Sequence, residues 1–269
     1  MQAAKHIIAV ASGKGGVGKS TTAINLALAL QSTGARVGLL DADIYGPSVA
    51  LMLGVPDGTR PDTRDGKTLV PVTAHGLVSM SMAYLANERT PVVWRGPMAG
   101  GALIQMLEQT DWGELDYLLI DMPPGTGDIQ LTLSQKAALS GAVIVTTPQD
   151  IALLDARKGI EMFRKVNVPV LGVIENMATH TCSECGHTES IFGSDGGERI
   201  SSEYGVELLA SLPLARTIRE HTDAGTPVVL SEADSPAAKA YMAAANALIQ
   251  VLQGKESPQD FPTISISDD

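Results

Sequence analysis

Short, continuous runs of apolar residues recur along the chain and alternate with stretches in which apolar residues repeat at helical spacing. Continuous apolar runs are typical of strands buried on both faces of a parallel sheet, whereas the helical spacing predicts amphipathic helices. The predicted strands cover residues 7–10, 37–40, 117–120, 143–145, 170–174 and 208–212. The predicted helices cover residues 21–31, 99–107, 129–138, 151–165 and 237–252.

This alternation predicts an α/β fold with a doubly wound, mainly parallel sheet flanked by helices. The chain of 269 residues has no convincing internal boundary, so residues 1–253 are predicted to form a single domain. Residues 254–269 are polar and end in acidic residues, which predicts a disordered acidic tail. Residues 56–75 are rich in Pro, Gly, Asp and Thr, which indicates an irregular insertion with at most short strands.

Composition and charge narrow the classes of function. Hydrophobic residues make up 44% of the chain but aromatic residues only 4%, so the core is predicted to be mainly aliphatic. The formal net charge of -11 argues against a general nucleic-acid surface and against binding to anionic membranes. No apolar run approaches the ~20 residues that cross a bilayer, and no charged segment followed by an apolar one opens the chain. We therefore expect a cytoplasmic protein with neither nucleic-acid nor membrane partners.

Residues 13–20 (GKGGVGKS) form a glycine-rich loop between a predicted strand and a predicted helix. That order is typical of a phosphate-binding P-loop, in which glycines let backbone N–H groups surround a phosphate at a helix N-terminus. Lys19 is expected to reach the β- and γ-phosphates of ATP, and the Ser20 hydroxyl to bind Mg²⁺. A plain glycine-rich turn is the alternative that the full motif disfavours. The predicted nucleotide-binding residues here are Gly13, Lys14, Gly15, Gly16, Val17, Gly18, Lys19, Ser20 and Thr21.

Polar residues follow three of the predicted strands, at the sheet edge where open α/β folds bind ligands. Asp41 and Asp43 follow the second strand; Asp43 is the candidate for positioning the attacking water, and Asp41 for the outer shell around Mg²⁺. Asp121 follows four apolar residues in a Walker B pattern and is expected to bind Mg²⁺ through water. Asn176 can donate to and accept from an adenine edge. Helix capping for the aspartates and a loop turn for the asparagine are the alternatives.

The chain contains two cysteines, Cys182 and Cys185, in a polar C-x-x-C loop. This spacing occurs in redox pairs, in half zinc sites and in half iron–sulfur sites. A complete zinc site within the chain could use His180 and His187 as the other two ligands. Two-fold symmetry could instead join the pairs of two chains into the four thiolates of a [4Fe–4S] cluster.

The second lysine of the loop, Lys14, makes the motif resemble the deviant Walker A class, which includes MinD, ParA, nitrogenase iron protein and the Mrp/ApbC iron–sulfur carriers. In that class the extra lysine contacts the nucleotide of the partner subunit across a dimer. The resemblance therefore implies a homodimeric, Mg-dependent ATPase. Its implied catalytic residues are Lys14, Lys19 and Asp43.

Further segments resemble the Mrp/ApbC family in particular, and together they cover nearly the whole chain. They are residues 94–98 (WRGPM), 121–128 (DMPPGTGD), 147–150 (TPQD), the cysteine loop, and Phe192-Gly193. The resemblance implies a [4Fe–4S] cluster bridged across the homodimer by Cys182 and Cys185 and passed to apo iron–sulfur proteins. It also implies a γ-phosphate switch at residues 123–128 and adenine contacts by Asn176 and Pro213.

Many members of that family carry an extra N-terminal domain, whereas this chain starts at the first predicted strand, so we expect that domain's function to be absent. Three rivals remain. A MinD- or ParA-like positioning ATPase would ordinarily have a basic or amphipathic C-terminal helix, which the acidic tail argues against. An electron donor like nitrogenase iron protein uses widely separated cysteines. The third rival is an ATP-dependent enzyme with a zinc-stabilised loop.

Overall fold

The computed structural model describes residues 3–85 and 96–256 and is built on an eight-stranded sheet. The strand order is β12-β9-β8-β1-β7-β2-β6-β5, and neighbouring strands are parallel except for β5, which pairs antiparallel with β6 at one edge. The strands are β1 (Ala4–Ala11), β2 (Val37–Asp41), β5 (Val72–Ala74), β6 (Leu77–Ser81), β7 (Leu115–Asp121), β8 (Gly141–Thr146), β9 (Val170–Glu175) and β12 (Leu208–Ser211). The predicted doubly wound, mainly parallel α/β fold is confirmed.

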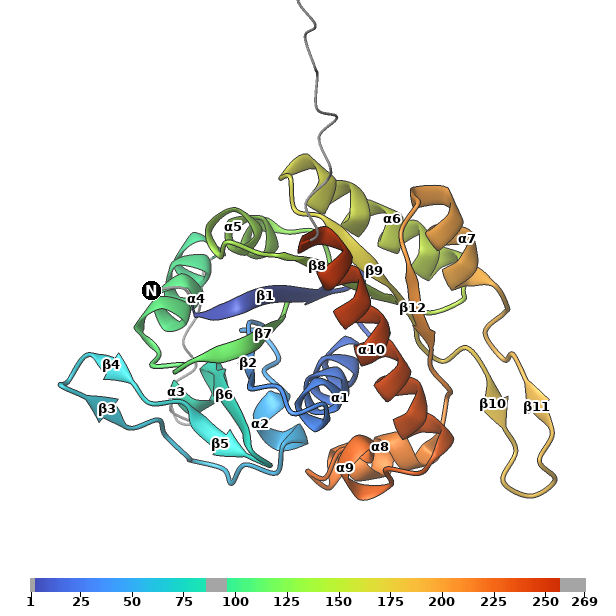
Figure 1. Ribbon diagram of the computed structural model, residues 1–269, viewed down its shortest axis with the longest axis horizontal. Coiled ribbons are helices and arrows are strands. Elements are labelled where there is room, and N and C mark those ends of the chain that lie inside the picture. The colour runs from blue at the N-terminus through green and yellow to red at the C-terminus, as the bar shows by residue number, and fades with distance from the viewer. Residues whose placement is uncertain (1–2, 86–95, 257–269) are drawn as a thin grey trace, which may run out of the picture.

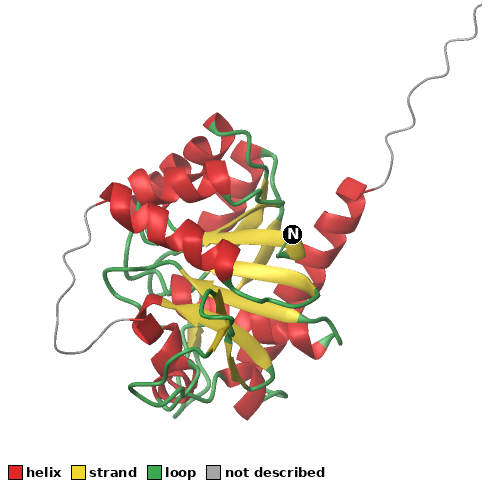
Figure 2. Ribbon diagram, turned by 90° about the vertical axis from the view of Figure 1, so that its left-hand side faces the viewer, coloured by secondary structure: helices red, strands yellow, loops and turns green. Residues whose placement is uncertain are grey.

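Helices cover both faces of the sheet (Figures 1 and 2). One face carries α1 (Lys19–Ser32), α2 (Val49–Met52), α8 (Arg216–Asp223), α9 (Val228–Ser231) and α10 (Pro236–Glu256). The other carries α4 (Gly96–Gln109), α5 (Asp128–Lys136), α6 (Asp150–Lys165) and α7 (Gly196–Tyr204). The short helix α3 (Met82–Leu85) follows β6. Among the described residues, no helix is both long and apolar enough to span a membrane.

The first strand shows why its apolar run is continuous rather than alternating. Ile8 and Val10 are buried in the core beneath α1 and α10, while Ile7 and Ala9 are buried in the core beneath the α4–α7 layer. Because successive side chains point to opposite faces and both faces are covered, both sets must be apolar. β8 shows the same continuous apolar pattern and is buried along its whole length, as expected for a strand inside the sheet.

Two small hairpins project from opposite sides of the body (Figure 1). One joins β3 (Thr63–Arg64) to β4 (Thr68–Leu69), and the other joins β10 (His180–Thr181) to β11 (Thr188–Glu189). The prediction of short strands within residues 56–75 is confirmed, although β5 belongs to the main sheet. The second hairpin carries both cysteines.

All six predicted strands and all five predicted helices are present. The sequence pattern missed β6, the two short strands of the cysteine hairpin, the helices α7 and α8, and the four-residue helices α2, α3 and α9. In β6 the apolar run is interrupted by Ser79 and Ser81, which are fully buried because their hydroxyls bond to Tyr84 and Asp41. The last helix continues to Glu256, so residues 254–256 are helical rather than the start of a tail. Residues 257–269 lie outside the described part of the chain, and the disordered tail stays a prediction.

Candidate nucleotide site and cysteine hairpin

The predicted nucleotide site lies where three neighbouring strands end. The glycine loop follows β1, Asp121 is the last residue of β7, and Asp41 is the last residue of β2. The strand register pairs Val10 with Asp121 and Asp121 with Asp41. Because parallel strands end at one edge of a sheet, residues far apart in the sequence meet at a single point.

The loop enters α1 through Gly18, whose φ of 80° lies in the left-handed region. A Cβ atom at Gly18 would stand 2.2 Å from the Asn176 side-chain nitrogen, so both the backbone angle and the space require glycine. At Gly13 a Cβ would meet the carbonyl oxygen of Asp155 at 2.0 Å. Gly13 is therefore needed for close packing against α6, a reason that the sequence motif does not show. The first-turn N–H groups of α1 lack helical acceptors and form a ready anion site.

Lys19, Ser20 and Asp121 form the centre of the site. The Lys19 ammonium is 6% exposed, pairs with Asp121 Oδ1 and donates to Ser20 Oγ at 3.1 Å. Asp121 is fully buried, and burial raises the pKa of its carboxyl while the Lys19 charge opposes that shift. Its other oxygen, Oδ2, has no hydrogen-bond partner among the described residues. A buried carboxylate oxygen beside a hydroxyl fits a hydrated Mg²⁺, so these residues suit the predicted metal.

Asp41 is held mainly by the start of α2. Its Oδ2 accepts hydrogen bonds from the backbone N–H groups of Ser48 (3.1 Å) and Val49 (3.2 Å) and from Ser81 Oγ (3.0 Å). Burial, and then the nearby Asp121 carboxylate, raise the pKa of Asp41 to about 7. These contacts support helix capping, the alternative to the predicted place in the outer shell of Mg²⁺.

Asp43 lies beside a groove of about 320 Å³ at the edge of the site. Its backbone N–H donates to Asp41 Oδ1 at 3.1 Å, and its Oδ1 accepts from Gly46 N at 3.2 Å. The groove is also lined by Pro123, Pro124 and Asp128, which belong to the predicted switch. The structure thus brings the candidate water-positioning carboxylate and the candidate γ-phosphate sensor to one groove. Asp128 itself opens α5, where a negative charge stabilises the helix N-terminus.

The Asn176 side chain is 7% exposed and is bound to the glycine loop. Its Nδ2 donates to the Val17 carbonyl oxygen at 2.8 Å, and its Oδ1 accepts from Met177 N at 3.0 Å. An amide has two N–H groups and two acceptor lone pairs, so one of each is left for an adenine edge. Pro213 is half-buried and follows β12, whose neighbour in the sheet is β9. Both predicted base contacts therefore belong to adjacent strand ends.

The cysteine hairpin holds two free thiols, with Cys182 half-buried and Cys185 exposed. Its turn is closed by hydrogen bonds from Cys182 N to His187 O and from Gly186 N to Cys182 O, both 2.9 Å. Backbone N–H groups of Cys185 and Glu184 point at the Cys182 sulfur and lower the pKa of its thiol. A lowered pKa favours the thiolate that binds metal.

The histidines near these thiols do not complete a metal site within one chain. His180 Nδ1 is hydrogen-bonded to the Leu214 carbonyl oxygen at 3.1 Å. Across residues 3–85 and 96–256, no group of three or more His, Cys, Asp or Glu side chains is placed to hold a metal ion. The structure of a single chain thus gives no support to the zinc alternative.

The structure gives only part of the information needed for two predicted features, Lys14 and the segment 94–98. Lys14 is half-buried at the start of the loop, and its carbonyl oxygen accepts from Ser12 Oγ at 2.9 Å. Of the segment 94–98, Trp94 and Arg95 lie outside the described residues, while Met98 is 61% exposed in the first turns of α4. The trans-acting role of Lys14 stays a prediction.

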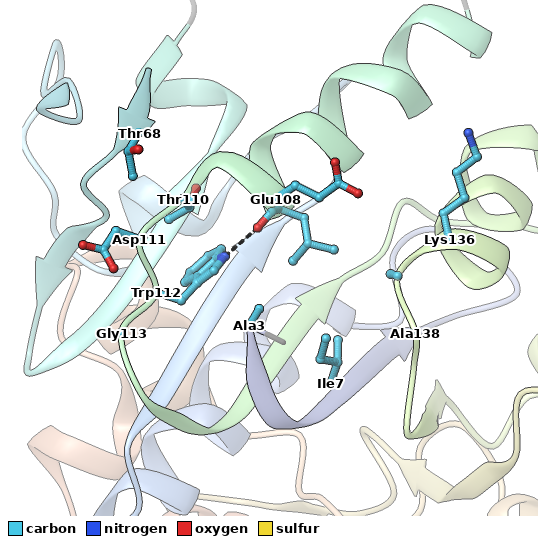
Figure 3. A pocket seen from close by; sticks show the side chains of 12 residues that line it. Ala3, Ile7, Thr68, Glu108, Thr110, Asp111, Trp112, Gly113, Lys136 and Ala138 are labelled. Atoms are coloured by element: carbon cyan, nitrogen blue, oxygen red, sulfur yellow. Dashed lines mark hydrogen bonds between the residues drawn. The ribbon is translucent and has the colours of Figure 1, made fainter. Parts of the chain in front are cut away.

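A larger pocket of about 370 Å³ lies at the opposite edge of the sheet, beside the amino end of β1 (Figure 3). Trp112 lies in its wall and donates from Nε1 to the Leu107 carbonyl oxygen at 2.9 Å. Glu108, Asp111 and Lys136 lie around it, and none of the predicted site residues lines it. Pocket size therefore does not mark the predicted site in this fold.

Sequence reasoning missed three polar residues that support the site. Ser81 bonds to Asp41, Gln130 Nε2 donates to the Pro123 carbonyl oxygen, and Glu175 is 4% exposed beside Asn176. Ser81 was missed together with its strand. The signal for Glu175 was a charged residue at the end of an apolar run, in the same position as Asp41 and Asp121.

Comparison with known proteins agrees with this geometry. A family model described as ParA, NUBPL iron-transfer P-loop NTPase, matches residues 3–249. An iron–sulfur cluster carrier protein of Pseudomonas fragi is 66% identical over 237 residues, which cover 88% of this chain and 83% of the relative. The Escherichia coli K12 protein of the same description is 59% identical, over 86% of this chain and 62% of its own length. The chain thus spans less than two thirds of that relative.

A mouse protein described as iron–sulfur cluster transfer protein NUBPL is 49% identical over 96% of this chain and 81% of the relative. Among solved structures, an ADP-bound nucleotide-binding protein of Archaeoglobus fulgidus has a TM-score of 0.75 at 36% identity and covers 87% of this chain and 90% of its own. The Mg-ADP complex of the septum site-determining protein MinD of Pyrococcus horikoshii has a TM-score of 0.71 at 26% identity, with coverages of 94% and 99%. The chain belongs to the ParA/NUBPL family of iron-transfer P-loop NTPases.

Proposed function

From this family membership, we propose that the protein is an ATP-hydrolysing carrier that holds a [4Fe–4S] cluster and transfers it to apo iron–sulfur proteins. The single observation that carries the proposal is one chain that holds both a complete P-loop centre, Lys19 with Ser20 and Asp121, and a separate hairpin with two free, accessible thiols. The relatives described as cluster carriers support it. We place it in the cytoplasm, as the sequence leads us to expect.

The nucleotide half of the proposal follows from the loop and the strand ends. Residues 13–21 would surround the phosphates of ATP, with the Lys19 ammonium moving from Asp121 toward the β- and γ-oxygens. Ser20 and, through water, Asp121 would hold Mg²⁺, which neutralises charge on the phosphates. Asp43 would orient the attacking water, and Asn176 and Pro213 would contact the base. The ADP-bound and Mg-ADP-bound neighbours support this arrangement.

The cluster half of the proposal requires two chains. Each hairpin offers two thiolates, Cys182 and Cys185, while a [4Fe–4S] cluster takes four. A two-fold axis would bring the two hairpins together, and Lys14 would then reach the nucleotide of the partner. Hydrolysis would reset this dimer rather than transform a metabolite.

Anaerobic reconstitution with iron and sulfide tests the proposal. One cluster shared by two chains predicts about two irons and two sulfides per chain and a shift toward dimer. The Cys182→Ala, Cys185→Ala double variant should lose the iron, because no thiolate remains on the hairpin. ATPase activity should persist in it, since the two sites are separate.

His180→Ala and His187→Ala are the matched controls, because they alter the same hairpin without removing a thiolate. Both should keep their iron, as measured by metal analysis and visible absorption. Full iron retention in the double cysteine variant would refute the carrier function. Loss of metal from either histidine variant, in a colourless protein that binds zinc, would favour the enzyme with a zinc loop.

A further inference from the structure

The cysteine hairpin is joined to the sheet through a short paired segment that also contacts the glycine loop. We propose that this segment, the hairpin root, transmits nucleotide binding to the two thiols, with Asn176 and Glu175 as its positioning residues. The root consists of residues 175–179 and 211–214. The inference rests on the proposed function in one respect, that ATP binds at the glycine loop.

Asn176 stands where the chain leaves the sheet for the hairpin. Its side chain bonds on one side to the Val17 carbonyl oxygen in the glycine loop (2.8 Å) and on the other to Met177 N (3.0 Å). The approach is close enough that Gly18 cannot carry a Cβ atom. A single buried amide therefore connects the phosphate-binding backbone to the first residue of the hairpin segment. Any shift of Val17 on phosphate binding changes the geometry of that link.

The second segment of the root, residues 211–214, is hydrogen-bonded to the first. Ala178 N donates to the Leu212 carbonyl oxygen (2.9 Å), and Leu214 N donates to the Thr179 carbonyl oxygen (2.7 Å). Pro213 lies between those two bonded residues. Both side chains predicted to contact adenine, Asn176 and Pro213, thus belong to the root itself. A base bound between them would touch the hairpin's attachment directly.

Glu175 binds the segment of chain that returns from the hairpin. Its Oε1 accepts from Gly197 N, in the first turn of α7, at 2.9 Å, and its Oε2 accepts from Ser211 Oγ at 3.1 Å. A Cβ atom at Gly197 would lie 2.9 Å from the Glu175 Cβ, which requires glycine at this close approach. Glu175 is therefore bonded both to the start of α7, where the chain returns from the hairpin, and to Ser211 in the second segment of the root.

The hairpin beyond the root can carry such a movement outward. It projects from the body (Figure 1), and its strands and turn are closed by its own backbone bonds, including Cys182 N to His187 O. A hairpin that is braced internally and attached at one end reorients when its attachment shifts. The two thiols near its tip would then change their exposure and their spacing to a partner.

Thiol alkylation by iodoacetamide tests this link without any cluster. The rates at Cys182 and Cys185 are measured by mass spectrometry with and without a saturating, non-hydrolysable Mg-ATP analogue. In wild type, the alkylation rates should change about fivefold or more when the analogue binds, which is the lower end of ordinary coupling between two sites. Asn176→Ala should lose the response even when titration shows that the analogue fully occupies the site.

Asn25→Ala is the matched control. Asn25 is also a buried asparagine, but its side chain donates to Thr21 O and accepts from Val229 N, and neither residue belongs to the root. The Asn25→Ala variant should be less stable than wild type, but its thiol alkylation rates should still change when the analogue binds. Glu175→Gln keeps an oxygen for Gly197 N and should retain most of the response, whereas Glu175→Ala should lose it.

An unchanged response in Asn176→Ala at full occupancy, or no response in wild type that binds the analogue, would overturn the inference. Either result would leave iron reconstitution intact, so the carrier function would stand. Conversely, a thiol response that depends on Asn176 in a protein that takes up no iron would support the link and refute the carrier function.

Discussion

The parallel strands end at the carboxyl edge of the sheet and begin at its amino edge. Aspartates at these two edges have pKa values shifted in opposite directions. At the carboxyl edge Asp41 is fully buried near Asp121, and its pKa is raised to about 7. At the amino edge Asp116 lies between Lys5 and Arg36, and the Lys5 ammonium at 2.8 Å is the main cause that lowers its pKa to about 2. The first environment disfavours a carboxylate and the second favours it.

The difference shows where this fold keeps groups for chemistry. At the carboxyl edge a lysine and two aspartates are buried together, and one Asp121 oxygen lacks a partner among the described residues. Such an arrangement costs folding free energy and is typical of sites that gain a ligand. At the amino edge the charges form complementary pairs, Lys5 with Asp116 and Arg36 with Glu114. Glu108, Asp111 and Lys136 lie around the pocket at that edge (Figure 3). Substitutions should therefore change activity at the first edge and stability at the second.

The largest effect is expected for Lys19→Ala. It removes the charge that would bind the β- and γ-phosphates, so ATP hydrolysis should fall by about three orders of magnitude. Phosphate release measures this. Lys5→Ala at the amino edge is the control and should hydrolyse ATP at the wild-type rate. Asp43→Ala, at the carboxyl edge, should lose hydrolysis yet still bind ATP. Wild-type turnover in purified Lys19→Ala, with contaminating ATPases excluded, would remove the carboxyl edge from the mechanism.

A second experiment tests whether the carboxyl edge is completed by a partner. Because Lys14 is predicted to act across a dimer, Lys14→Ala and Lys19→Ala chains should each be inactive alone. Mixed, they form heterodimers with one intact composite site, and some of the wild-type hydrolysis rate should return. Normal hydrolysis by Lys14→Ala alone would show that the second lysine has no trans-acting role.

The sequence predicted the centre of the fold and of the nucleotide site because both depend on local patterns. Continuous apolar runs located the six strands that carry or neighbour the site, and the glycine motif located Lys19 and Ser20. Asp121 followed from the end of an apolar run. Since parallel strands end together, their meeting point could be foreseen without coordinates.

The parts that were missed depend on contacts between distant segments. Ser81 is buried because its hydroxyl bonds to Asp41, forty positions away, and no local pattern reports that bond. Gly13 is required by the Asp155 backbone, and the link from Asn176 to Val17 spans 159 positions. Helix capping by Asp41 was named only as the alternative, because the four-residue helix α2 that it contacts has no periodicity to detect.

Trp112→Phe tests the stabilising role of the amino edge. The tryptophan is 5% exposed and bonded to the Leu107 carbonyl oxygen, so the change removes a buried hydrogen bond and leaves a small void. The free energy of unfolding in urea should fall by about 1–3 kcal/mol. ATP hydrolysis by the folded variant should be unchanged. A loss of activity without a loss of stability would reverse the assignment of the two edges.

The smallest effect is expected for Asp116→Asn, and its pH dependence gives it a signature. The folded pKa of about 2 lies below the ordinary value of 3.8, so the ionised carboxylate stabilises the folded state above about pH 4. That stabilisation is lost as the pH falls from about 4 toward 2. A pair at the protein surface, here with an exposed Lys5 and a half-buried Asp116, contributes about 1 kcal/mol at most. The free energy of unfolding of wild type should therefore exceed that of Asp116→Asn by no more than this at pH 6. Urea unfolding at decreasing pH should show the gap closing, because protonation makes the two side chains alike in charge. A gap that stays constant as the pH falls would show that the Lys5 and Arg36 contacts of Asp116 do not act through its charge.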